Sequence, residues 1–510
     1  MAAGDSNGPA IIGIDAGTQS IRAIAFDLTG RRLASAARAT PIERIGRGGE
    51  HDPNEIFAVV MTVLGEVGRA LAGRPVAGMA VASFGECCVL VDEAGNALGS
   101  SLAWFDRRTE PLAEKIADAV GRERIFAITG AALDPTLTLH KLAWLAANRP
   151  EDMKRAKRVL MMADWIAFRL SGEAATDPSL ASRTQYIAIH ERKWSEEMLA
   201  AGGFGVEKIA PLAGSGTAIG TVRPEILAAT GIAGKPVVGV GGHDHVVGAF
   251  AAGFTAPGTI LDSLGTAEAI LVAGTDPCRD RRVIDLGVAQ GLIMTSRPMS
   301  YFISGMETSG GTVEWWRSVI GGVPTETLIE AARGLPAGSH GVVFLPHLTS
   351  SPPPKRDDDG RGAFVGLTTV ASRESLYRAV LEGLAFQARA MLDALAGVAG
   401  IPAGQPVRVI GGSTRNPLFL QIKADVFGRR LIVIDEAEAT ALGAALLGGI
   451  AAGVFADLDA AVSGLHREER IIDPGADRQS YEELFTGAFA PLQETLAPIS
   501  HRLARFSRAG

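Results

Sequence analysis

Hydrophobic and polar residues alternate with a period of two near the start of the chain, which indicates short β-strands rather than helices. Three such segments follow one another, and tight polar turns join them, a pattern typical of an antiparallel meander. The segments are residues 10–14, 21–27 and 32–39. The apolar spacing then becomes helical at 53–71, where Asp52 is a candidate N-cap and Pro53 stands at the first helical position.

Strand and helix patterns alternate along the rest of the chain, as they do in α/β proteins. In the first half, strands are expected at 76–83 and 89–92, and the stretch 109–169 is mainly helical with breaks near Gly130 and Pro150. In the second half, the expected strands are 236–242, 259–263, 268–273, 407–410 and 431–434, and the expected helices are 375–395, 416–426 and 439–452.

One pattern occurs twice: a strand, a turn with adjacent glycine and threonine, and a second strand. The turns contain Gly17-Thr18 and Gly265-Thr266, about 250 residues apart, which is too far for a solenoid repeat. A duplicated domain explains the two copies more simply. The boundary between the two domains then falls near 249–256, before Pro257.

Two further segments have an unusual composition. The stretch 439–456 has no charged residue, but glycine interrupts its larger apolar groups, so we expect a closely packed helix inside a domain rather than a membrane span. The segment 350–362 reads SSPPPKRDDDGRG and is expected to be a surface loop. Beyond Asp457 the pattern is helical and amphipathic.

The chain has 510 residues, with 49 Lys and Arg against 56 Asp and Glu, and a formal net charge of −7. This mild acidity argues against the basic patch that nucleic acid needs and the polybasic cluster that anionic lipid needs. The cysteines, Cys87, Cys88 and Cys278, are too few for a disulfide framework and form no CxxC pair. Without a targeting segment, such reduced thiols predict a cytoplasmic protein.

The turn 15–20 combines glycine, hydroxyls and a carboxylate between two strands. Gly17 lets an anion approach the backbone closely, and Thr18 and Ser20 offer hydrogen-bond donors. Asp15 can hold Mg²⁺ through water, because that ion prefers oxygen ligands and keeps part of its hydration. The alternative is a polar hairpin turn with an Asx cap, but the second Gly-Thr turn favours two loops that clamp a polyphosphate. Neither turn is a Walker loop, and the chain has no Rossmann fingerprint.

The sequence His243-Asp244-His245 follows a strand and has three interpretations. The histidines could bind a metal, although zinc needs further ligands for which no spaced partner is present. Asp244 could instead cap the helix that follows. As a third possibility, Asp244 accepts the proton of a substrate hydroxyl, for which a weak base suffices when the transition state of phosphoryl transfer is loose.

Glu86 and Trp104 lie near expected strand ends on either side of the turn 92–97. A carboxylate beside an indole can hold a polyol, because the acid binds hydroxyls and the ring face covers C–H groups. The alternative is a surface acid and a core tryptophan.

Seven segments of the chain carry a resemblance to a known family. They are IGIDAGTQSIRAIAFD at 12–27, AWFDRRT at 103–109, VGVGGHDHVVGAF at 238–250, DSLGTAEA at 262–269, RGAFVGLTTVASRESLYRAVLEGLAFQ at 361–387, GGSTRNPLFLQIKADVFGRRL at 411–431 and EATALGAALLG at 438–448. In this order and spacing, the chain resembles the FGGY family of carbohydrate kinases, within the superfamily of actin-like, sugar-kinase and chaperone ATPases.

The resemblance implies an α/β fold of two ribonuclease-H-like (actin-like ATPase) domains with a central interdomain cleft. Residues 10–250 would form the sugar-binding N-terminal domain and 256–455 the nucleotide-binding C-terminal domain, with 456–510 as a helical tail packed on the second domain. ATP and Mg²⁺ are the implied cofactors, and a small sugar is the implied partner. Neither nucleic acid nor a membrane is expected, and a homodimer is left open.

The resemblance also implies roles for individual residues. Asp15 matches the acid associated with Mg²⁺, and Asp244 matches the catalytic base. The substrate-pocket positions are Glu86, Trp104, Asp244 and His245. The nucleotide positions are Thr18, Gln19, Ser20 and Arg22 in the first phosphate loop, Gly265 and Thr266 in the second, and Gly310, Gly412 and Asn416 on the adenosine side.

The chain departs from the family pattern in three places. Ser375 replaces the acidic, amide or histidine residue usual in the C-terminal signature, and residues 351–354 replace an acidic–basic pair before a proline. Around Glu86-Cys87-Cys88 the chain lacks the Met-His pair of xylulose kinases and keeps only the Glu of the Arg-Glu pair of glycerol kinases. The overall pattern is most similar to ketose kinases of the fuculose and xylulose type.

We therefore expect ATP-dependent phosphorylation of a terminal hydroxyl on a small sugar, either a ketose or a related aldose or polyol. Two other classes stay open. One is a zinc-dependent hydrolase built on His243 and His245, and the other is an actin- or chaperone-like ATP-driven switch that grips another protein. The pair of Glu86 and Trp104 favours the sugar.

Overall fold

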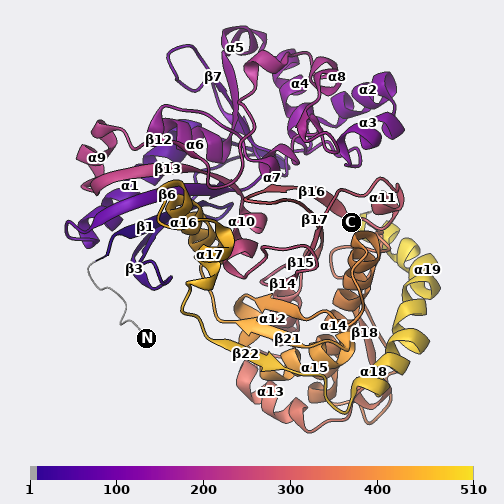
Figure 1. Ribbon diagram of the computed structural model, residues 1–510. Helices are drawn as coiled ribbons and strands as arrows, with labels where there is room; N and C mark the ends of the chain where they lie inside the picture. Colours follow the sequence, from indigo (N-terminus) through magenta and orange to yellow (C-terminus); the bar gives the residue numbers. More distant parts are fainter. Residues whose placement is uncertain (1–7, 509–510) are drawn as a thin grey trace.

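The computed structural model describes residues 8–508, which form two lobes, each built around a mixed β-sheet (Figure 1). We call residues 10–251 the first lobe, and residues 260–434 together with 469–508 the second lobe. The colours of Figure 1 separate them, because the first lobe is indigo to magenta and most of the second is salmon to yellow.

The first sheet has the strand order β12-β13-β6-β1-β2-β3. Strands β1, β2 and β3 form the expected antiparallel meander, while β6 pairs parallel with β1 and β13 pairs parallel with β6. The strands are β1 (Ala10–Ala16), β2 (Ser20–Phe26), β3 (Arg32–Ala39), β6 (Pro75–Ser83), β12 (Ala218–Thr221) and β13 (Ala233–His243).

The second sheet repeats this arrangement in the order β16-β17-β15-β14-β20-β21-β22. Its centre is again an antiparallel hairpin flanked by two parallel strands, so both sheets have the ribonuclease-H-like order that the sequence predicted. The strands are β14 (Ile260–Leu264), β15 (Glu268–Gly274), β16 (Ala289–Met294), β17 (Pro298–Met306), β20 (Val407–Ile410), β21 (Leu431–Ile434) and β22 (Glu469–Ile472).

Helices pack on both faces of the two sheets: one layer on the outer face of each sheet and one layer between the sheets. Helices α1 (Pro53–Ala70) and α6 (Met162–Ser171) bury one face of the first sheet, and Asp52 caps α1 as expected. Helices α14 (Arg373–Ala399) and α15 (Pro417–Phe427) bury the far face of the second sheet. Between the two sheets lie α10 (Asp244–Ala251) and α16 (Ala439–Ala451), which share one apolar core with both lobes.

Glycine makes the layer between the sheets possible. Helix α16 comes from the second half of the chain, yet it packs against β1, β6 and β13 of the first sheet (Figure 1). A Cβ atom on Gly13 of β1 would overlap the carbonyl of Ala441, and one on Gly443 would overlap the carbonyl of Val247 in α10. Backbone therefore contacts backbone at these positions, which explains why the uncharged stretch of the sequence contains so many small residues.

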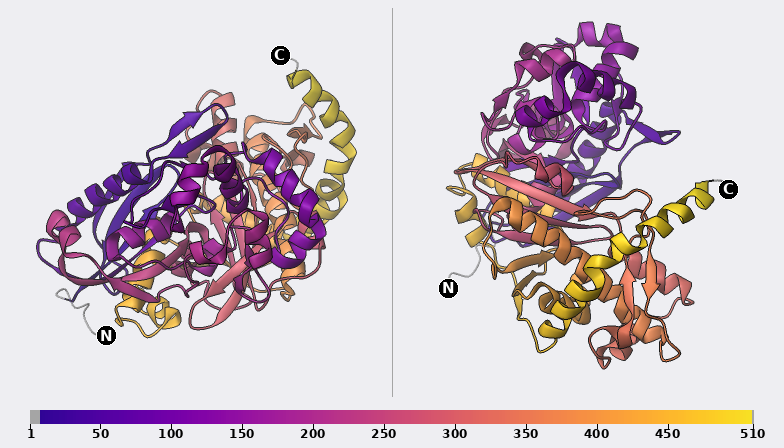
Figure 2. Two further views of the ribbon diagram at one scale, coloured as in Figure 1. Left: turned by 90° about the horizontal axis from the view of Figure 1, so that it is seen from above. Right: turned by 90° about the vertical axis from the view of Figure 1, so that its right-hand side faces the viewer.

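Smaller elements complete the lobes. In the first lobe they are β4 (Glu43–Ile45), β5 (Gly48–His51), β7 (Cys88–Val91), β8 (Ser101–Leu102), β9 (Arg158–Met161), β10 (Ile187–Ala188), β11 (Lys193–Trp194), α2 (Glu110–Val120), α3 (Arg122–Thr129), α4 (Thr138–Asn148), α5 (Pro150–Arg155), α7 (Pro178–Ala181), α8 (Glu196–Ala201) and α9 (Pro224–Thr230). The others are α11 (Arg282–Asp285), α12 (Gly310–Val319), α13 (Thr325–Arg333), β18 (Val343–Leu345), β19 (Ala363–Val365), α17 (Leu458–Ser463), α18 (Arg478–Leu484) and α19 (Ala490–Arg508). Figure 2 shows α19 running along the outside of the second lobe to the C-terminus.

Three expectations about elements are corrected. The mainly helical stretch 109–169 contains the strand β9, which pairs with β7, and the helical tail contains β22, which pairs with β21. Both strands have four residues, too few for a period to show in the sequence. The loop 350–362 is not wholly a surface loop, because Ser351 is buried and bridges to Asp357. Across residues 8–508, no helix combines the length and apolarity that crossing a membrane requires.

Candidate active site

A cavity of about 720 Å³ lies between the lobes, and side chains of both lobes line it. We call it the cleft cavity. Its first-lobe wall comes from the first hairpin turn, the segments 84–86 and 104–107, and the start of α10; its second-lobe wall comes from β15, β17 and the loop 349–356. Of the candidate site residues singled out in the sequence, those that line it are Thr18, Glu86, Trp104, His243, Asp244 and His245. Those that do not line it are Asp15, Gln19, Ser20, Arg22, Gly265, Thr266, Gly310, Gly412 and Asn416.

Asp15 stands next to the end of β1, where the first hairpin turn begins. The turn is closed by two hydrogen bonds: the amide of Gly17 donates to the carbonyl of Ser20 (3.1 Å), and the hydroxyl of Thr40 donates to the carbonyl of Gly17 (2.6 Å). Burial and the nearby charge of Asp244 raise the pKa of Asp15 to about 7. The two carboxylates are therefore close enough to interact, and of the two it is Asp244 that lines the cavity.

The other residues of the first turn face different partners. Nε of Arg22 donates to the hydroxyl of Ser20 (3.1 Å), and the same guanidinium forms an ion pair with Glu438 (2.9 Å) just before α16. The hydroxyl of Thr18 accepts a hydrogen bond from the indole N–H of Trp104 (3.1 Å), and Gln19 is exposed. The charge of Arg22 is thus already compensated, and Thr18 joins the phosphate side of the predicted site to its sugar side.

Asp244 is the first residue of α10, immediately after β13. The backbone N–H of His245 donates to its carboxylate (2.7 Å). Burial raises the pKa of Asp244 most, the charge of Glu86 raises it further, and the charges of His245 and Arg183 lower it. Because its pKa is raised, the ionised carboxylate of Asp244 accepts a proton more readily than the carboxylate of an exposed aspartate does.

The two histidines beside Asp244 do not form a metal site. Their rings are 5.4 Å apart, and Nε2 of His243 lies 3.4 Å from the carboxylate of Asp244. Burial, together with the charges of His245 and Arg183, lowers the pKa of His243 well below its usual value, so its ring is neutral near pH 7. In the described part of the chain, no group of three or more His, Cys, Asp or Glu side chains could hold an ion, which removes the support for a zinc centre.

Glu86 is held in a strained position. Its backbone φ of 62° lies in the left-handed region, which costs a residue with a Cβ on the order of 1–3 kcal/mol. Its carboxylate pairs with the guanidinium of Arg183 at 2.5 Å, and both side chains line the cleft cavity. The pair keeps a charged carboxylate stable at a mostly buried place and presents both a donor and an acceptor to a ligand.

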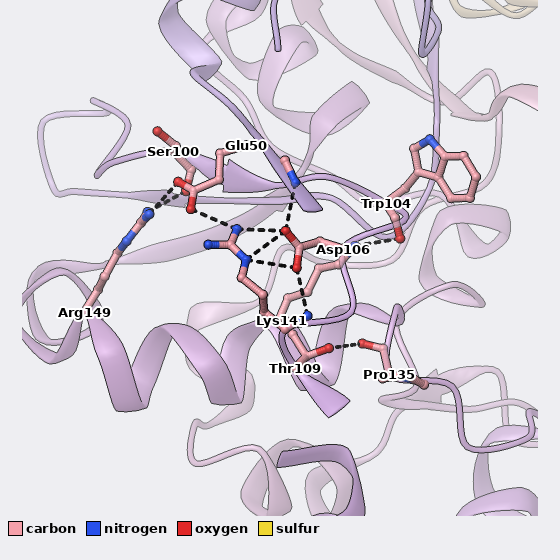
Figure 3. Close-up of polar contacts among 10 residues, drawn as sticks. Glu50, Ser100, Trp104, Asp106, Thr109, Pro135, Lys141 and Arg149 are labelled. Carbon is pink, nitrogen blue, oxygen red and sulfur yellow. Dashed lines mark hydrogen bonds and ion pairs between the residues drawn. The ribbon is translucent and has the colours of Figure 1, made fainter. Parts of the chain in front are cut away.

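Trp104 projects its indole into the cavity from the segment 103–109, and the side chain is 39% exposed. A buried polar network anchors this segment (Figure 3). The carboxylate of Asp106 accepts hydrogen bonds from the amide of Gly49 (3.0 Å) and from the side chain of Arg108 (2.8 Å), which also pairs with Glu50 (3.0 Å). The indole is therefore held at a fixed place on the wall.

In the second lobe, the predicted nucleotide residues gather around the second hairpin turn. The amide of Gly310, at the start of α12, donates to the carbonyl of Gly265 (3.2 Å), and the amide of Gly311 donates to the carbonyl of Thr266 (3.0 Å). A Cβ atom on Gly310 would lie 2.7 Å from the carbonyl of Gly265 and 3.3 Å from the hydroxyl of Ser413, next to Gly412. The turn, α12 and the segment 411–415 can meet only because position 310 has no side chain.

Both polar atoms of the Asn416 side-chain amide already have hydrogen-bond partners within the second lobe. Its Oδ1 accepts from the amide of Phe419 (3.1 Å) as the N-cap of α15, and its Nδ2 donates to the hydroxyl of Tyr377 (3.1 Å). Its side chain shapes the start of α15, so any effect on a nucleotide passes through that helix.

A buried ion cluster supports the second turn. The ammonium of Lys423 is fully buried and lies 2.7 Å from Asp262 on β14 and 2.5 Å from Glu268 on β15. The hydroxyl of Ser309 donates to the other oxygen of Glu268 (2.7 Å). Burial and the charge of Glu268 raise the pKa of Asp262 to about 7, even though Lys423 opposes the shift.

The cavity also contains polar residues that the sequence patterns do not indicate. Arg183, Tyr301 and Ser304 line it, and the hydroxyls of Tyr301 and Ser304 are buried without a hydrogen-bond partner. None of them lies in a local motif with a chemical meaning. The only signal in the sequence is that a mostly buried carboxylate such as Glu86 needs a cation nearby.

Two ribonuclease-H-like lobes, with a polar cavity between them and the carboxylate of Asp244 on its wall, are typical of phosphotransferases that close around nucleotide and acceptor. Models of the FGGY family of carbohydrate kinases match this chain over residues 10–251 (N-terminal domain) and 261–452 (C-terminal domain). The chain belongs to this family and is a carbohydrate kinase, an ATP-dependent phosphotransferase.

Individual relatives agree with the family. The chain is 33% identical to a glycerol kinase of Gloeobacter violaceus over 89% of this chain and 90% of the relative. It is 29% identical to an L-fuculokinase of Escherichia coli over 93% of this chain and 99% of the relative. The crystal structure of a xylulose kinase from Rhodospirillum rubrum matches with a TM-score of 0.86 at 26% identity, covering 96% of this chain and all of that one (100%). These relatives support neither a protein-gripping switch nor a zinc hydrolase.

Proposed function

We propose that this chain transfers the γ-phosphoryl group of ATP to a terminal hydroxyl of a small sugar or polyol, with Asp244 as the base. One observation carries the proposal: Asp244 lines the same cavity as the Glu86–Arg183 pair and the indole of Trp104. The ion pair can bind neighbouring hydroxyls, and the indole can cover the C–H face of the same molecule. The acceptor would then lie between Trp104 and Asp244.

In this proposal Asp244 orients the attacking hydroxyl and takes its proton late in the transfer. The hydrogen bond from the amide of His245 fixes the carboxylate, and the raised pKa increases its basicity. His243, which is neutral, can bond the carboxylate without adding a charge that would lower its basicity. The closed cavity would exclude water, which otherwise competes with the sugar as acceptor.

We infer that Asp15, with Asp244, holds Mg²⁺. The residues fit this ion, because Asp15 lies near Asp244, which lines the cavity, and Mg²⁺ is bound by one or two carboxylates plus phosphate oxygens and water. When bound, the ion would neutralise charge on the transferring phosphoryl group. The residues Thr18, Gln19, Ser20 and Arg22 would face the phosphates from the first lobe, and Gly265 and Thr266 from the second.

The adenosine side of the site is proposed at Gly310, Gly412 and Asn416. Its support is the contact of three segments around the side-chain-free position 310. Asn416 would act by fixing the start of α15. His245 is proposed as a further sugar contact because it lines the cavity beside Asp244.

We propose a division of the chain into residues 10–250, 256–455 and 456–510. The family models support the first two units, and the pairing of β22 with β21 supports a tail that packs on the second. A homodimer and a cytoplasmic location stay predictions; light scattering on the purified protein measures the former.

A panel of ketoses, aldoses and polyols in a coupled ADP-release assay tests the proposed function, since the relatives include kinases of glycerol, xylulose and fuculose. With the preferred acceptor, Asp244→Asn is expected to lower kcat by about 10²–10⁴, the usual loss for an acid–base group. The exposed Asp276→Asn is a matched control that should keep full activity. Near-normal turnover in Asp244→Asn would show that another group is the base.

A further inference from the structure

Lys141 is the feature of the first lobe that the proposed function leaves unexplained. It lies on α4, and its side chain is fully buried. Within residues 8–508, no carboxylate lies within ion-pair distance of its ammonium, unlike the other fully buried lysine, Lys423. Burying an ammonium without a counter-charge is costly, so the contacts that it does make are informative.

The ammonium of Lys141 donates to two backbone carbonyls, those of Glu86 and Trp104, each at 3.3 Å. Figure 3 shows the lysine reaching the carbonyl of Trp104 beside the Asp106 network. The carbonyl of Glu86 accepts a second hydrogen bond from the hydroxyl of Thr138 (3.1 Å), one turn earlier on α4. One helix thus holds two segments that are 18 positions apart in the chain and meet at the cavity.

Both segments need such support, for different reasons. Glu86 is in the left-handed region of φ, a conformation that persists only when its surroundings impose it. The segment of Trp104 is anchored on one side by Asp106 and by the hydroxyl of Thr109, which donates to the carbonyl of Pro135 (2.5 Å). The bond from Lys141 is the one that ties this segment to Glu86.

We propose that Lys141 is a positioning residue that sets the separation of Glu86 and Trp104, and thereby the fit of the sugar. An ammonium is suited to this task, because it has three donors and can bind two carbonyls at once. The inference rests on the proposed roles of Glu86 and Trp104 toward the acceptor. The ammonium of Lys141 donates to the carbonyls of Glu86 and Trp104, and neither carbonyl belongs to a proposed nucleotide residue.

The test compares Lys141→Met with Thr138→Val. Lys141→Met keeps the length of the side chain but releases both carbonyls, and it is expected to raise the KM for the sugar about tenfold or more, because small misplacements of substrate-positioning groups have large effects. Thr138→Val removes one donor to Glu86 only, and it is expected to raise the same KM about threefold. In both variants the KM for ATP should stay within about twofold of its original value.

A second readout separates positioning from general stability. Sugar binding is expected to change the fluorescence of Trp104, identified as the part of the signal that Trp104→Phe removes, and Lys141→Met should weaken that response in proportion to its KM. The exposed Lys154→Met, on α5, controls for the loss of one positive charge. If Lys141→Met does not fold, Thr138→Val alone decides, and an unchanged sugar KM in that variant overturns the proposal.

The outcomes also separate this inference from the proposed function. If Glu86→Gln and Trp104→Phe leave the KM for every sugar unchanged, the proposed pocket is wrong. If these two variants raise the sugar KM but Lys141→Met does not, the pocket stands and the role of Lys141 is wrong. If Lys141→Met raises the KM for the sugar and the KM for ATP equally and also lowers the fraction of active protein, the role of Lys141 is merely structural.

Discussion

The first and the second lobe place the same strand–turn–strand hairpin beside the cleft cavity, but the carboxylates on the first strands of the two hairpins meet different partners. Asp15, on β1, has a pKa raised to about 7, and the nearby Arg22 forms its ion pair with Glu438 instead. Asp262, on β14, shares the buried ammonium of Lys423 with Glu268. The second lobe thus contains a cation that pairs with its carboxylates, whereas in the first lobe the cation, Arg22, pairs with Glu438 and only partly offsets the charge of Asp15.

This difference shows how a duplicated framework can serve two tasks. A built-in lysine keeps the second turn in one arrangement whether or not a nucleotide is present. In the first lobe Arg22 pairs with Glu438 and not with Asp15, so a bound cation would neutralise the carboxylate of Asp15. Three predictions test this comparison.

Removing the built-in cation is expected to have the largest effect on stability. Lys423→Met leaves Asp262 and Glu268 buried without a counter-charge, which should lower the free energy of unfolding by about 3–5 kcal/mol. Chemical denaturation measures the loss, and Lys154→Met, an exposed lysine, is the control. Adding Glu268→Gln to Lys423→Met should recover part of the loss; a change below about 1 kcal/mol in the single variant would mean that the cluster is not a stabilising ion pair.

Removing the carboxylate of Asp15 is expected to affect catalysis instead. Asp15→Asn should lower kcat by about 10² or more, since charge stabilisation of the transferring phosphoryl group is lost. Asp262→Asn, in the second lobe, should lower kcat far less, because Lys423 then retains Glu268 as a partner. Steady-state kinetics with saturating ATP and sugar measures both, and similar losses in the two variants would erase the distinction between the turns.

The smallest expected effect is the contribution of Asp15 to the pH dependence of the free energy of unfolding. The folded state raises the pKa of Asp15 from 3.8 to about 7, so it binds this proton more tightly than the unfolded state does, and this group makes the protein less stable as pH rises from about 4 to 7. Asp15→Asn should therefore be more stable than the original protein by about 1–2 kcal/mol at pH 8, and by less at pH 5. Denaturation curves at both pH values, without divalent cations, measure the difference; the opposite sign would show that Asp15 is stabilised as a carboxylate.

The sequence predicted most of the central framework because its signals are local. The first meander and the second hairpin appear within two residues of their expected places, and α14 begins two residues earlier and ends four residues later than expected. The strands β9 and β22 were not predictable in this way. Each is defined by a partner strand, β7 or β21, that lies far from it in the chain.

The residues of the candidate site likewise fall into those with a local sequence signal and those without one. Asp15, Asp244 and the Gly-Thr turns stand in motifs that a reader of the sequence can find. Arg183 becomes meaningful only through its contact with Glu86, 97 positions away in the chain, and Lys141 only through two backbone carbonyls. The sequence also predicted Asn416 at the nucleotide, whereas in the structure its amide is occupied by the cap of α15 and by Tyr377.

The glycine-lined contact of α16 with the first sheet has a consequence for synthesis on the ribosome. The last strand of that sheet ends at His243, but α16, which packs against β1, β6 and β13, begins only at Ala439. At about 5–20 residues per second, an apolar surface stays bare for roughly ten seconds or more after the strands themselves have emerged. During that interval the nascent protein would depend on chaperones to avoid aggregation, and a truncated chain that stops before α16 would never escape that dependence.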